Sequence, residues 1–367
     1  MYYINRQRSY SKRKEKTKMK KIKSTSLCLV AVTLLCGGYF ATSPAFAETK
    51  DQNLYKCIVD EYNKLEGVEK IGYDATMTQT QLDKVTTLTC DNEGVTDASF
   101  ISNLRFLTFL NLDNNNFSTI DTSASGTHLQ KLHVANSHLS TINVQQNTAL
   151  EELVASGNNL SSINTTKNTE LASLTVNNNI LNSLDISANT KLKYLYADVN
   201  KLAGVDVSKS KELIQIHLYN NLITSIDLSN NDKLQSLYVG KNKLTSLNLA
   251  KNKMLEVLSA YSNNISGIDL SNNTNLVHIQ LDNNKLSKID LTKNQKLTEV
   301  HLSQNNLSEL DLSNNKSLKN LYIPTNNIKS VDLTQNVELV DLKADDILIN
   351  VGLAAIENED GLVLDIS

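Results

Sequence analysis

Apolar residues recur with a period of 21 residues along most of this chain. Leucine occupies ten positions at that spacing: Leu129, Leu150, Leu171, Leu192, Leu213, Leu234, Leu255, Leu276, Leu297 and Leu318. With each of these leucines taken as position 1 of a unit, positions 4, 6, 11, 14 and 16 are also apolar almost throughout, and position 9 is Asn in nine of the ten units. A unit this short cannot bury its own apolar side, so neighbouring units must stack and share one continuous core.

The order of positions within a unit predicts its backbone. The run L-x-x-L-x-L-x-x-N is the signature of a leucine-rich repeat. Alternation along a strand places positions 4 and 6 inward and positions 3, 5 and 7 outward, and the Asn at position 9 can hydrogen-bond backbone groups of adjacent turns. Positions 11, 14, 16 and 19 repeat this spacing in a half that is poor in helix formers. We therefore expect a leucine-rich-repeat solenoid with a curved, parallel concave β-sheet and short extended or turn segments on the convex side.

The chain before the repeats predicts two further parts. Residues 1–47 hold a basic run, an apolar segment and the small-x-small sequence Ala45-Phe46-Ala47, which is the pattern of a secretory signal peptide. Residues 48–84 predict a small α-helical N-terminal cap, because helical spacing of apolar residues runs from Asn53 to Leu65 behind Asp51 or Asn53 as the N-cap. A second short helix is expected from Gln79 to Lys84.

The remaining boundaries follow from where the period holds. Residues 85–347 predict about 13 leucine-rich repeats, mostly of 21 residues, beginning with two irregular units of 22 residues at Val85 and Leu107. The second of these units accommodates its extra residue within 123–128. Residues 348–367 are expected to form a C-terminal cap of short strands.

The balance of charge restricts the partners. Residues 1–47 hold 10 of the 36 Lys and Arg and 1 of the 39 Asp and Glu, so the rest of the chain carries 26 against 38, a net charge of −12. An acidic protein is a poor candidate for nucleic acid or an anionic membrane surface. No later apolar run is long enough to span a bilayer, and the C-terminus shows no L-P-x-T-G sorting signal. We expect a monomer that is secreted into the extracellular space, with no transmembrane helix and no sortase anchor.

Two cysteines follow the predicted signal peptide, and they allow two interpretations. Cys57 in the first helix and Cys90 in the first strand could form a disulfide, as exported proteins permit. Alternatively, Cys90 lies at inward position 6 and acts as a small buried apolar residue. The inward position favours the second interpretation.

The outward positions 3, 5 and 7 carry the candidate binding residues, because packing does not dictate their identity. All six tyrosines between Val85 and Ser367 stand at these positions. With the neighbouring histidines they predict a partner-binding patch on the concave face: Tyr194, Tyr196, His217, Tyr219, Tyr238, Tyr261, His278, His301 and Tyr322. Such a patch favours a protein ligand. Two alternatives stay open: a glycan or cell-wall ligand that stacks on the tyrosines, and a merely structural role, because Tyr is a good strand former.

Other chemistry has less support. His278 and His301 lie in adjacent units, but no third metal ligand is evident. Asp recurs at position 15 in eight units, where it could gather calcium or cap the backbone of its own turn, and the capping role is favoured. The sequence shows no nucleophile–His–acid arrangement and no Gly-rich phosphate loop. We therefore expect no enzymatic activity, no cofactor and no metal.

The chain resembles the internalin family of exported leucine-rich-repeat proteins from Gram-positive pathogens. The signal peptide, the cap sequence TQTQLDKVTTLT (Thr78–Thr89), the stretch Thr96–Asn115 and the 21-residue unit with L-D-L-S carry the resemblance. It implies host interaction and virulence, through binding of a host or surface protein on the concave face. In some of that subgroup cysteines stack at one repeat position. Here only Cys90 does so, and the equivalent positions hold Val134, Ala155, Val176 and Ala197.

Overall fold

A computed structural model describes residues 51–351 and 363–365 of the chain. The chain divides into two units, Met1–Ala45 and Phe46–Ser367. The described residues all belong to the second unit. The predicted signal peptide, residues 1–47, lies outside them.

Two helices precede the first repeat, and both lie where the sequence predicts them. Helix α1 (Gln52–Lys64) has Asp51 as its N-cap, whose Oδ1 accepts from the backbone N–H groups of Asn53 and Leu54 at 2.9 and 3.0 Å. Helix α2 (Gln79–Leu82) begins with a capping box between Thr78 and Gln81, an arrangement that satisfies two backbone donors at once.

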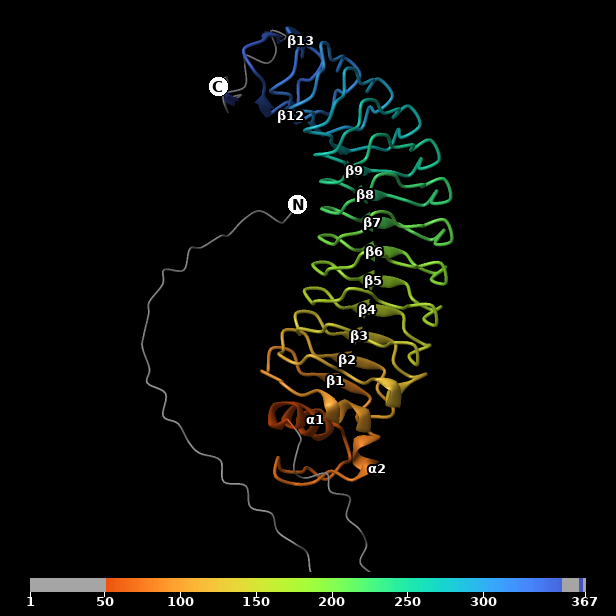
Figure 1. The fold of residues 1–367 in the computed structure, drawn as a ribbon. Helices are drawn as coiled ribbons and strands as arrows, with labels where there is room; N and C mark the ends of the chain where they lie inside the picture. Colours follow the sequence, from red (N-terminus) through yellow and green to blue (C-terminus); the bar gives the residue numbers. More distant parts are fainter. Residues whose placement is uncertain (1–50, 352–362, 366–367) are drawn as a thin grey trace, which may run out of the picture. The chain divides into compact units, whose positions relative to one another are not determined.

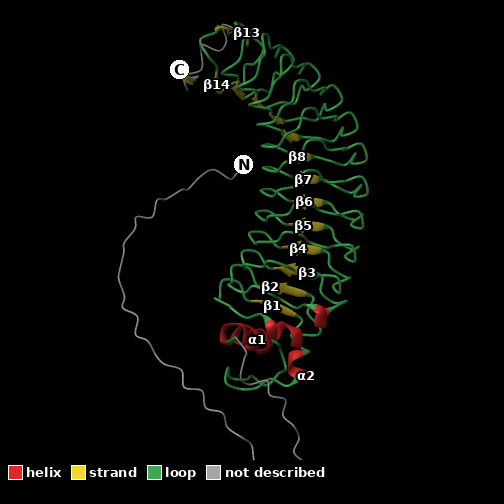
Figure 2. Cartoon of the chain, in the orientation of Figure 1, coloured by secondary structure: helices red, strands yellow, loops and turns green. Residues whose placement is uncertain are grey.

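Each repeat then contributes one short strand to a single parallel sheet, and Figures 1 and 2 show these strands stacked one above another. The strands are β1 (Thr87–Thr89), β2 (Phe109–Asn111), β3 (Lys131–His133), β4 (Glu152–Val154), β5 (Ser173–Thr175), β6 (Tyr194–Tyr196), β7 (Gln215–His217), β8 (Ser236–Tyr238), β9 (Val257–Ser259), β10 (His278–Gln280), β11 (Glu299–His301), β12 (Asn320–Tyr322), β14 (Asp341–Lys343) and β16 (Val363–Asp365). This is one strand more than the number of units, because β16 lies in the segment predicted as the C-terminal cap.

The strands pair in one constant register. Each covers positions 3 to 5 of its unit, so that Tyr196, for example, pairs with His217 and His217 with Tyr238. Like positions of successive units therefore form continuous rows across the sheet, separated by about 4.8 Å. This constant register is the geometric basis for any patch on the concave face.

The convex side has no α-helix between residues 126 and 351, as expected from its turn-forming residues. Two short 3₁₀ helices, η1 (Ser99–Asn103) and η2 (Ser123–Ser125), occur in the irregular 22-residue units. The second lies within the stretch that was expected to accommodate the extra residue. Near the C-terminal end, β13 (Ser330–Asp332) and β15 (Leu348–Asn350) form a separate parallel pair.

The inward leucines form the continuous core. Positions 1, 4 and 6 are fully buried through the regular units, as for Leu192, Leu195 and Ala197. Each fully buried leucine contributes roughly 1.5–3 kcal/mol relative to an exposed one, so the core gains stability with every unit that stacks on it. The predicted inward and outward assignments are confirmed.

Asparagines at position 9 bond the backbone of two units. Asn242 is typical: its Nδ2 donates to the carbonyl oxygens of Leu218, Val239 and Gly240, and its Oδ1 accepts from the N–H of Ile223. Both ends of the buried amide are thus satisfied, as a polar group in the core requires. We call this row the first asparagine ladder.

A second asparagine ladder runs through position 19. Its Nδ2 groups donate to the preceding unit, as Asn252 does to Leu228 and Asn231 at 3.1 and 2.8 Å. Its Oδ1 atoms differ from those of the first ladder. Seven of them have no partner among the described protein groups: those of Asn168, Asn231, Asn252, Asn273, Asn294, Asn315 and Asn336.

The aspartates at position 15 cap their own turns. Each accepts from the backbone N–H two residues later at 2.9 Å, and the eight acceptors are Asp121, Asp185, Asp206, Asp227, Asp269, Asp290, Asp311 and Asp332. Hydrogen bonds from the residue two positions on lower the pKa of these carboxyl groups, as for Asp227 beside Ser229. The favoured capping role is confirmed.

The N-terminal cap is tied to the first repeat in two ways. Cys57 of α1 and Cys90 after β1 form a disulfide with 5.6 Å between their Cα atoms. The interpretation favoured from the sequence was wrong on this point: Cys90 is buried, as its inward position requires, but it is also bonded. In addition, Asp51 Oδ2 accepts from the N–H groups of Thr96 and Asp97, so one side chain caps α1 and holds the first repeat.

Candidate binding face of the concave sheet

The nine predicted aromatic residues all lie on or just after strands β6 to β12. Seven of them stand in the strands at positions 3 or 5, while Tyr219 and Tyr261 follow β7 and β9 at position 7. Every one is half-buried. The structure therefore brings all of them to one face, but their ring contacts divide them into groups.

Three rings on β6, β7 and β8 form the first ring cluster. The His217 ring lies between those of Tyr196 and Tyr238, with centroids 4.7 and 4.2 Å away. Stacking of this kind stabilises by about 0.5–1.5 kcal/mol per pair beyond area burial. Burial raises the pKa of the Tyr238 hydroxyl. Burial also raises the pKa of Tyr196, and the nearby Tyr194, Tyr238 and Asp198 raise it further.

A second contact joins tyrosines that are two units apart. The rings of Tyr219 and Tyr261 lie 5.8 Å apart across the intervening unit, whose position 7 is Gly240. A Cβ atom at Gly240 would stand 2.6 Å from Tyr261 Cε1, which is far inside van der Waals contact. The missing side chain of Gly240 is therefore what allows this tyrosine pair to form.

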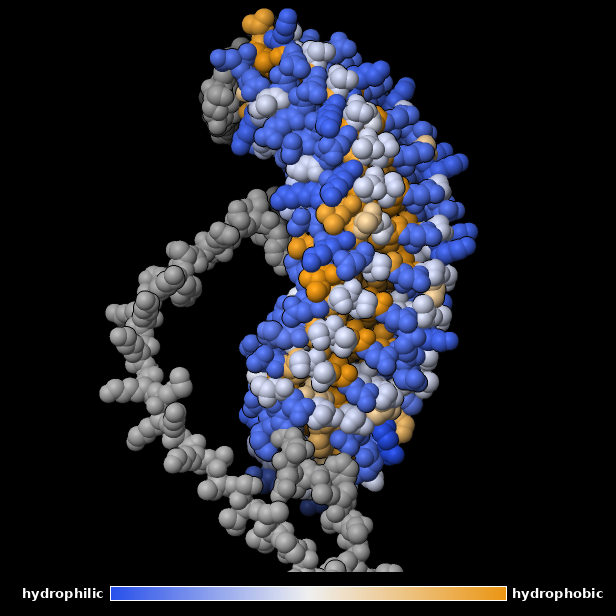
Figure 3. Space-filling view, in the orientation of Figure 1, coloured by the Kyte–Doolittle hydropathy of each residue, from blue (hydrophilic) through white to orange (hydrophobic). Residues whose placement is uncertain are grey.

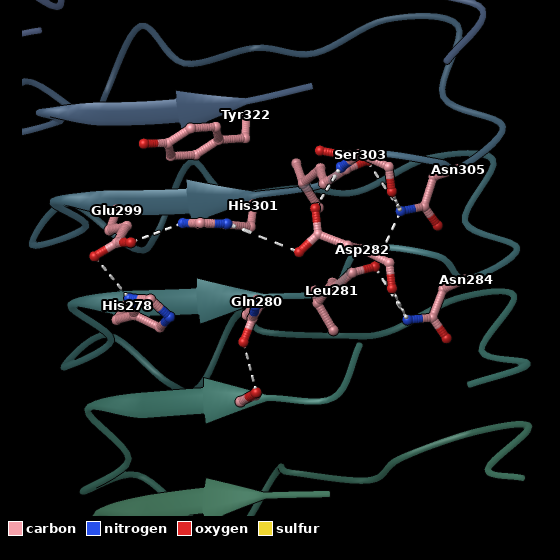
Figure 4. Close-up of polar contacts among 12 residues, drawn as sticks. His278, Gln280, Leu281, Asp282, Asn284, Glu299, His301, Ser303, Asn305 and Tyr322 are labelled. Carbon is pink, nitrogen blue, oxygen red and sulfur yellow. Dashed lines mark hydrogen bonds and ion pairs between the residues drawn. The ribbon is translucent and has the colours of Figure 1, made fainter. Parts of the chain in front are cut away.

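The second ring cluster lies on β10, β11 and β12 and is shown in Figure 4. His301 stacks between His278 and Tyr322, with centroids 5.6 and 4.3 Å away. The sequence suggested that His278 and His301 approach each other, and Glu299 bridges them: its carboxylate lies 3.0 Å from His278 Nδ1 and 2.7 Å from His301 Nε2. Burial lowers the pKa of His278.

Tyr322 is held from the far side of the second ring cluster. Its hydroxyl donates to the Asp341 carboxylate of β14. Burial, and then this hydrogen bond, raise the pKa of Tyr322 to about 12. The phenol therefore stays protonated and remains a donor throughout the physiological pH range.

Position 7 has a structural role that sequence reasoning missed. An acidic or amide side chain there accepts from the backbone N–H at position 7 of the next unit: Asp198 from Tyr219 at 2.7 Å, and Asp282 from Ser303 at 2.9 Å. Asn177 does the same for the N–H of Asp198 at 2.8 Å. These side chains position the chain leaving each strand, and an amide serves as well as a carboxylate.

A third aromatic group near the N-terminal end was also missed. The Phe109 and His133 rings of β2 and β3 meet edge-on with centroids 5.4 Å apart, and His133 Nε2 lies 3.2 Å from the Glu152 carboxylate. Both rings stand at outward positions 3 and 5. The signal is the same as for the tyrosines, an aromatic ring at an outward position, but these two rings stand in units that carry no tyrosine.

Within residues 51–351 and 363–365, no group of three or more His, Cys, Asp or Glu side chains is placed to hold a metal ion. In the same part of the chain, no helix has the length and apolar character needed to cross a membrane. The side of the molecule seen in Figure 3 is mainly hydrophilic, with hydrophobic patches along the stack.

The fold and its repeat pattern define a leucine-rich-repeat protein. The functional domain of InlJ from Listeria monocytogenes, which includes a cysteine ladder, is similar with a TM-score of 0.66 and 30% identity, over 80% of this chain and 59% of that one. This chain thus spans less than two thirds of the InlJ domain.

Two further solved structures share the fold. The internalin InlF from Listeria monocytogenes matches with a TM-score of 0.60 and 22% identity, over 82% of this chain and 89% of that one. The plant peptide hormone receptor RGFR1, in complex with RGF2, matches with a TM-score of 0.62 and 22% identity, over 74% and 49%. No family model matches the chain, and no curated protein matches its sequence.

The cysteine arrangement separates this chain from the InlJ domain. Cys90 at position 6 pairs with Cys57 of α1. The next positions in the same row hold Leu112, Val134 and Ala155, all fully buried. The single position-6 cysteine of the described repeats thus fastens the cap.

Proposed function

We propose that this chain is a secreted, internalin-like binding protein that recognises a host or surface protein through its concave face. The observation that carries the proposal is the gathering of six tyrosines and three histidines on or just after β6 to β12, eight of which contact one another in three groups. Rigid aromatic side chains supply contact area at low cost in conformational entropy. A surface already ordered by stacking keeps the cost of association low.

The ring contacts favour a protein over a glycan. A sugar that stacks on an aromatic side chain needs an open ring face. The planes of His217 and Tyr238 differ by only 32° at a centroid distance of 4.2 Å, and those of His301 and Tyr322 by 33° at 4.3 Å. Neighbouring rings therefore cover one another's faces and present mainly edges and polar atoms, which suit the mixed chemistry of a protein surface.

The similar solved structures add support at the level of the fold. InlJ and InlF are internalins, and the structure of the plant peptide hormone receptor RGFR1 is that of a complex with RGF2. The predicted signal peptide supports secretion. A role in virulence is part of the proposal and follows from the internalin resemblance.

The test is a double substitution, Tyr196→Ala with Tyr238→Ala, which removes both outer rings of the first ring cluster. Capture of surface proteins from host-cell membrane extracts should fall at least tenfold, since central aromatic anchors typically cost 2 kcal/mol or more each. The free energy of unfolding should fall by only about 1–3 kcal/mol, because both rings are half-buried.

The matched control is Leu222→Ala with Met254→Ala. These side chains are 42% and 46% exposed and lie outside positions 3, 5 and 7, so the control removes apolar surface away from the face. Unchanged capture by the tyrosine variant would contradict the proposal. Binding found on a glycan array, and lost in the tyrosine variant, would instead support the glycan alternative.

A further inference from the structure

The face between β6 and β12 has an unequal distribution of charge. Its outward positions 3, 5 and 7 carry three carboxylates, Asp198, Asp282 and Glu299, and no Lys or Arg. Two lysines border it: Lys241 Nζ lies 5.2 Å from the centroid of the Tyr219 ring, and Lys343 Nζ lies 5.4 Å from that of Tyr322. The surface that carries the tyrosines is therefore negative when its histidines are neutral.

The carboxylates are half-buried and accessible. The side chains of Asp198 and Asp282 are each 20% exposed, and that of Glu299 is 34% exposed. Burial acts to raise the pKa of Glu299, but hydrogen bonds with His301 and His278 outweigh it, and the pKa lies below its ordinary value. Glu299 is therefore ionised at neutral pH.

Aromatic rings beside carboxylates match one kind of side chain. An arginine guanidinium pairs with a carboxylate through two N–H donors, and its planar head and aliphatic stem pack against aromatic groups. Lysine offers the same charge and stem without the planar head. An acidic partner would instead meet like charge, with no Lys or Arg at any outward position of β6 to β12 to compensate it.

We propose that this face binds a positively charged segment of its protein partner, one that carries Arg and Lys side chains. The inference rests on the proposed function and narrows it from any protein to a basic one. Charge of opposite sign would steer the partner onto the face and fix its register, while the tyrosines supply the contact area.

Every carboxylate of the face has a histidine neighbour, which gives the binding a pH dependence. Asp198 lies 3.7 Å from His217, Asp282 lies 3.9 Å from His301, and Glu299 contacts both His301 and His278. The other titratable groups that contact these rings are tyrosines, Tyr196 and Tyr238 at His217 and Tyr322 at His301. Tyr322 in turn contacts Asp341 and Lys343.

Acidification should therefore weaken the binding of a basic partner. Each histidine that gains a proton would cancel the charge of one carboxylate and so reduce the attraction for a basic segment. His278 should be the last to contribute, because burial lowers its pKa.

The charge can be removed without disturbing the backbone. In Asp198→Asn and Asp282→Asn the amide oxygen can keep the bond to the next unit, as Asn177 already does. We combine these two with Glu299→Gln. The matched control is Asp113→Asn, because Asp113 makes the same bond, to the N–H of Ala135, in the unit of β2, outside this face.

The probe is a random library of 15-residue peptides displayed on phage and selected on the full chain at neutral pH. Enriched peptides should carry net positive charge. Synthesised as free peptides, they should bind the triple variant roughly tenfold or more weakly, at about two- to fivefold per carboxylate, and the Asp113→Asn control unchanged. Their affinity should also fall on acidification to about pH 5.5 and at high salt.

Three results would overturn the inference: enriched peptides that are neutral or acidic, no enrichment over the triple variant, or equal affinity for the triple variant and the parent. Binding to the Tyr196→Ala, Tyr238→Ala variant distinguishes this inference from the proposed function. Peptides whose binding depends on the tyrosines but not on the carboxylates would agree with the proposed binding face and contradict only the inference of a basic partner. Peptides whose binding depends on neither would contradict both the binding face and the basic partner.

Discussion

The two asparagine ladders use the same residue at the same 21-residue spacing, yet they are not equivalent. In the first ladder, at position 9, both the NH₂ and the carbonyl oxygen of the amide are bonded, as for Asn242. In the second, at position 19, the NH₂ is bonded but most of the oxygens have no protein partner. The second half of the repeat unit thus repeats the buried asparagine of the first half but not its full set of hydrogen bonds.

The exceptions within the second ladder show what decides the difference. Asn147 and Asn189 have satisfied oxygens, because the hydroxyls of Thr122 and Thr165 donate to them at 2.8 Å. Those threonines stand at position 16 of the preceding unit. Each of the seven unpaired oxygens instead faces a unit with Val or Leu at position 16. Whether the side-chain oxygen of a second-ladder asparagine is hydrogen-bonded therefore depends on whether the preceding unit has a hydroxyl at position 16.

The largest expected effect comes from breaking one rung of each ladder within a single unit. Asn242→Ala removes four hydrogen bonds and leaves the buried N–H of Ile223 without its acceptor, so it should destabilise by about 3–4 kcal/mol. Asn252→Ala removes only the two bonds of its NH₂ and also an oxygen that had no protein partner, so about 1–2 kcal/mol is expected. Urea midpoints at constant slope would measure both. Equal losses would mean that the ladders are equivalent after all.

An intermediate effect is expected from Thr165→Val, which keeps the shape of the side chain and removes its hydroxyl. The oxygen of Asn189 then loses its donor, and the second ladder acquires an eighth unpaired rung. We expect a loss of about 1–2 kcal/mol in the free energy of unfolding. If the variant is as stable as the parent, the threonine hydroxyl does not support the ladder.

The smallest effect should come from the reverse change, Val144→Thr, which offers a hydroxyl to the unpaired oxygen of Asn168. Burying a hydroxyl without a partner usually costs about 1–3 kcal/mol. Here the new bond should offset that cost and bring the change to within about 0.5 kcal/mol of the parent. Val176→Thr, at the fully buried position 6, is the control and should show the uncompensated loss. Similar losses in both variants would contradict the role given to position 16.

Much of the fold could be predicted because the repeat period encodes it many times over. Leu195 and Ala197 had to face inward once the strand was placed, and Asn242 had to find backbone partners. The tyrosines had to share a face because Tyr196 and Tyr238 occupy the same position of their units. These inferences need only periodicity and the geometry of a strand.

What could not be predicted depends on contacts between particular units. The pairing of Cys57 with Cys90 required the orientation of α1 against β1, which no spacing reveals. The left-handed backbone at position 8 is visible in sequence only where Asn or Gly stands there, and Val199 adopts it with a φ of 53°, a conformation that β-branched residues rarely take. The role of Gly240 became evident only from the tyrosines on either side of it.

The grouping of rings on the concave face has a further basis in the unbroken register of the sheet. The two ring clusters are separated by the unit that contributes β9, where Val257 and Ser259 stand in place of rings. Because every regular unit has the same length, deleting residues 255–275 as a block would carry Gln280 to the side of Tyr238 and leave the core sequence in phase. The distance between the two ring clusters is thus set by the number of repeat units between them. A series of variants with units deleted or added there would measure the length of the ligand that contacts both clusters.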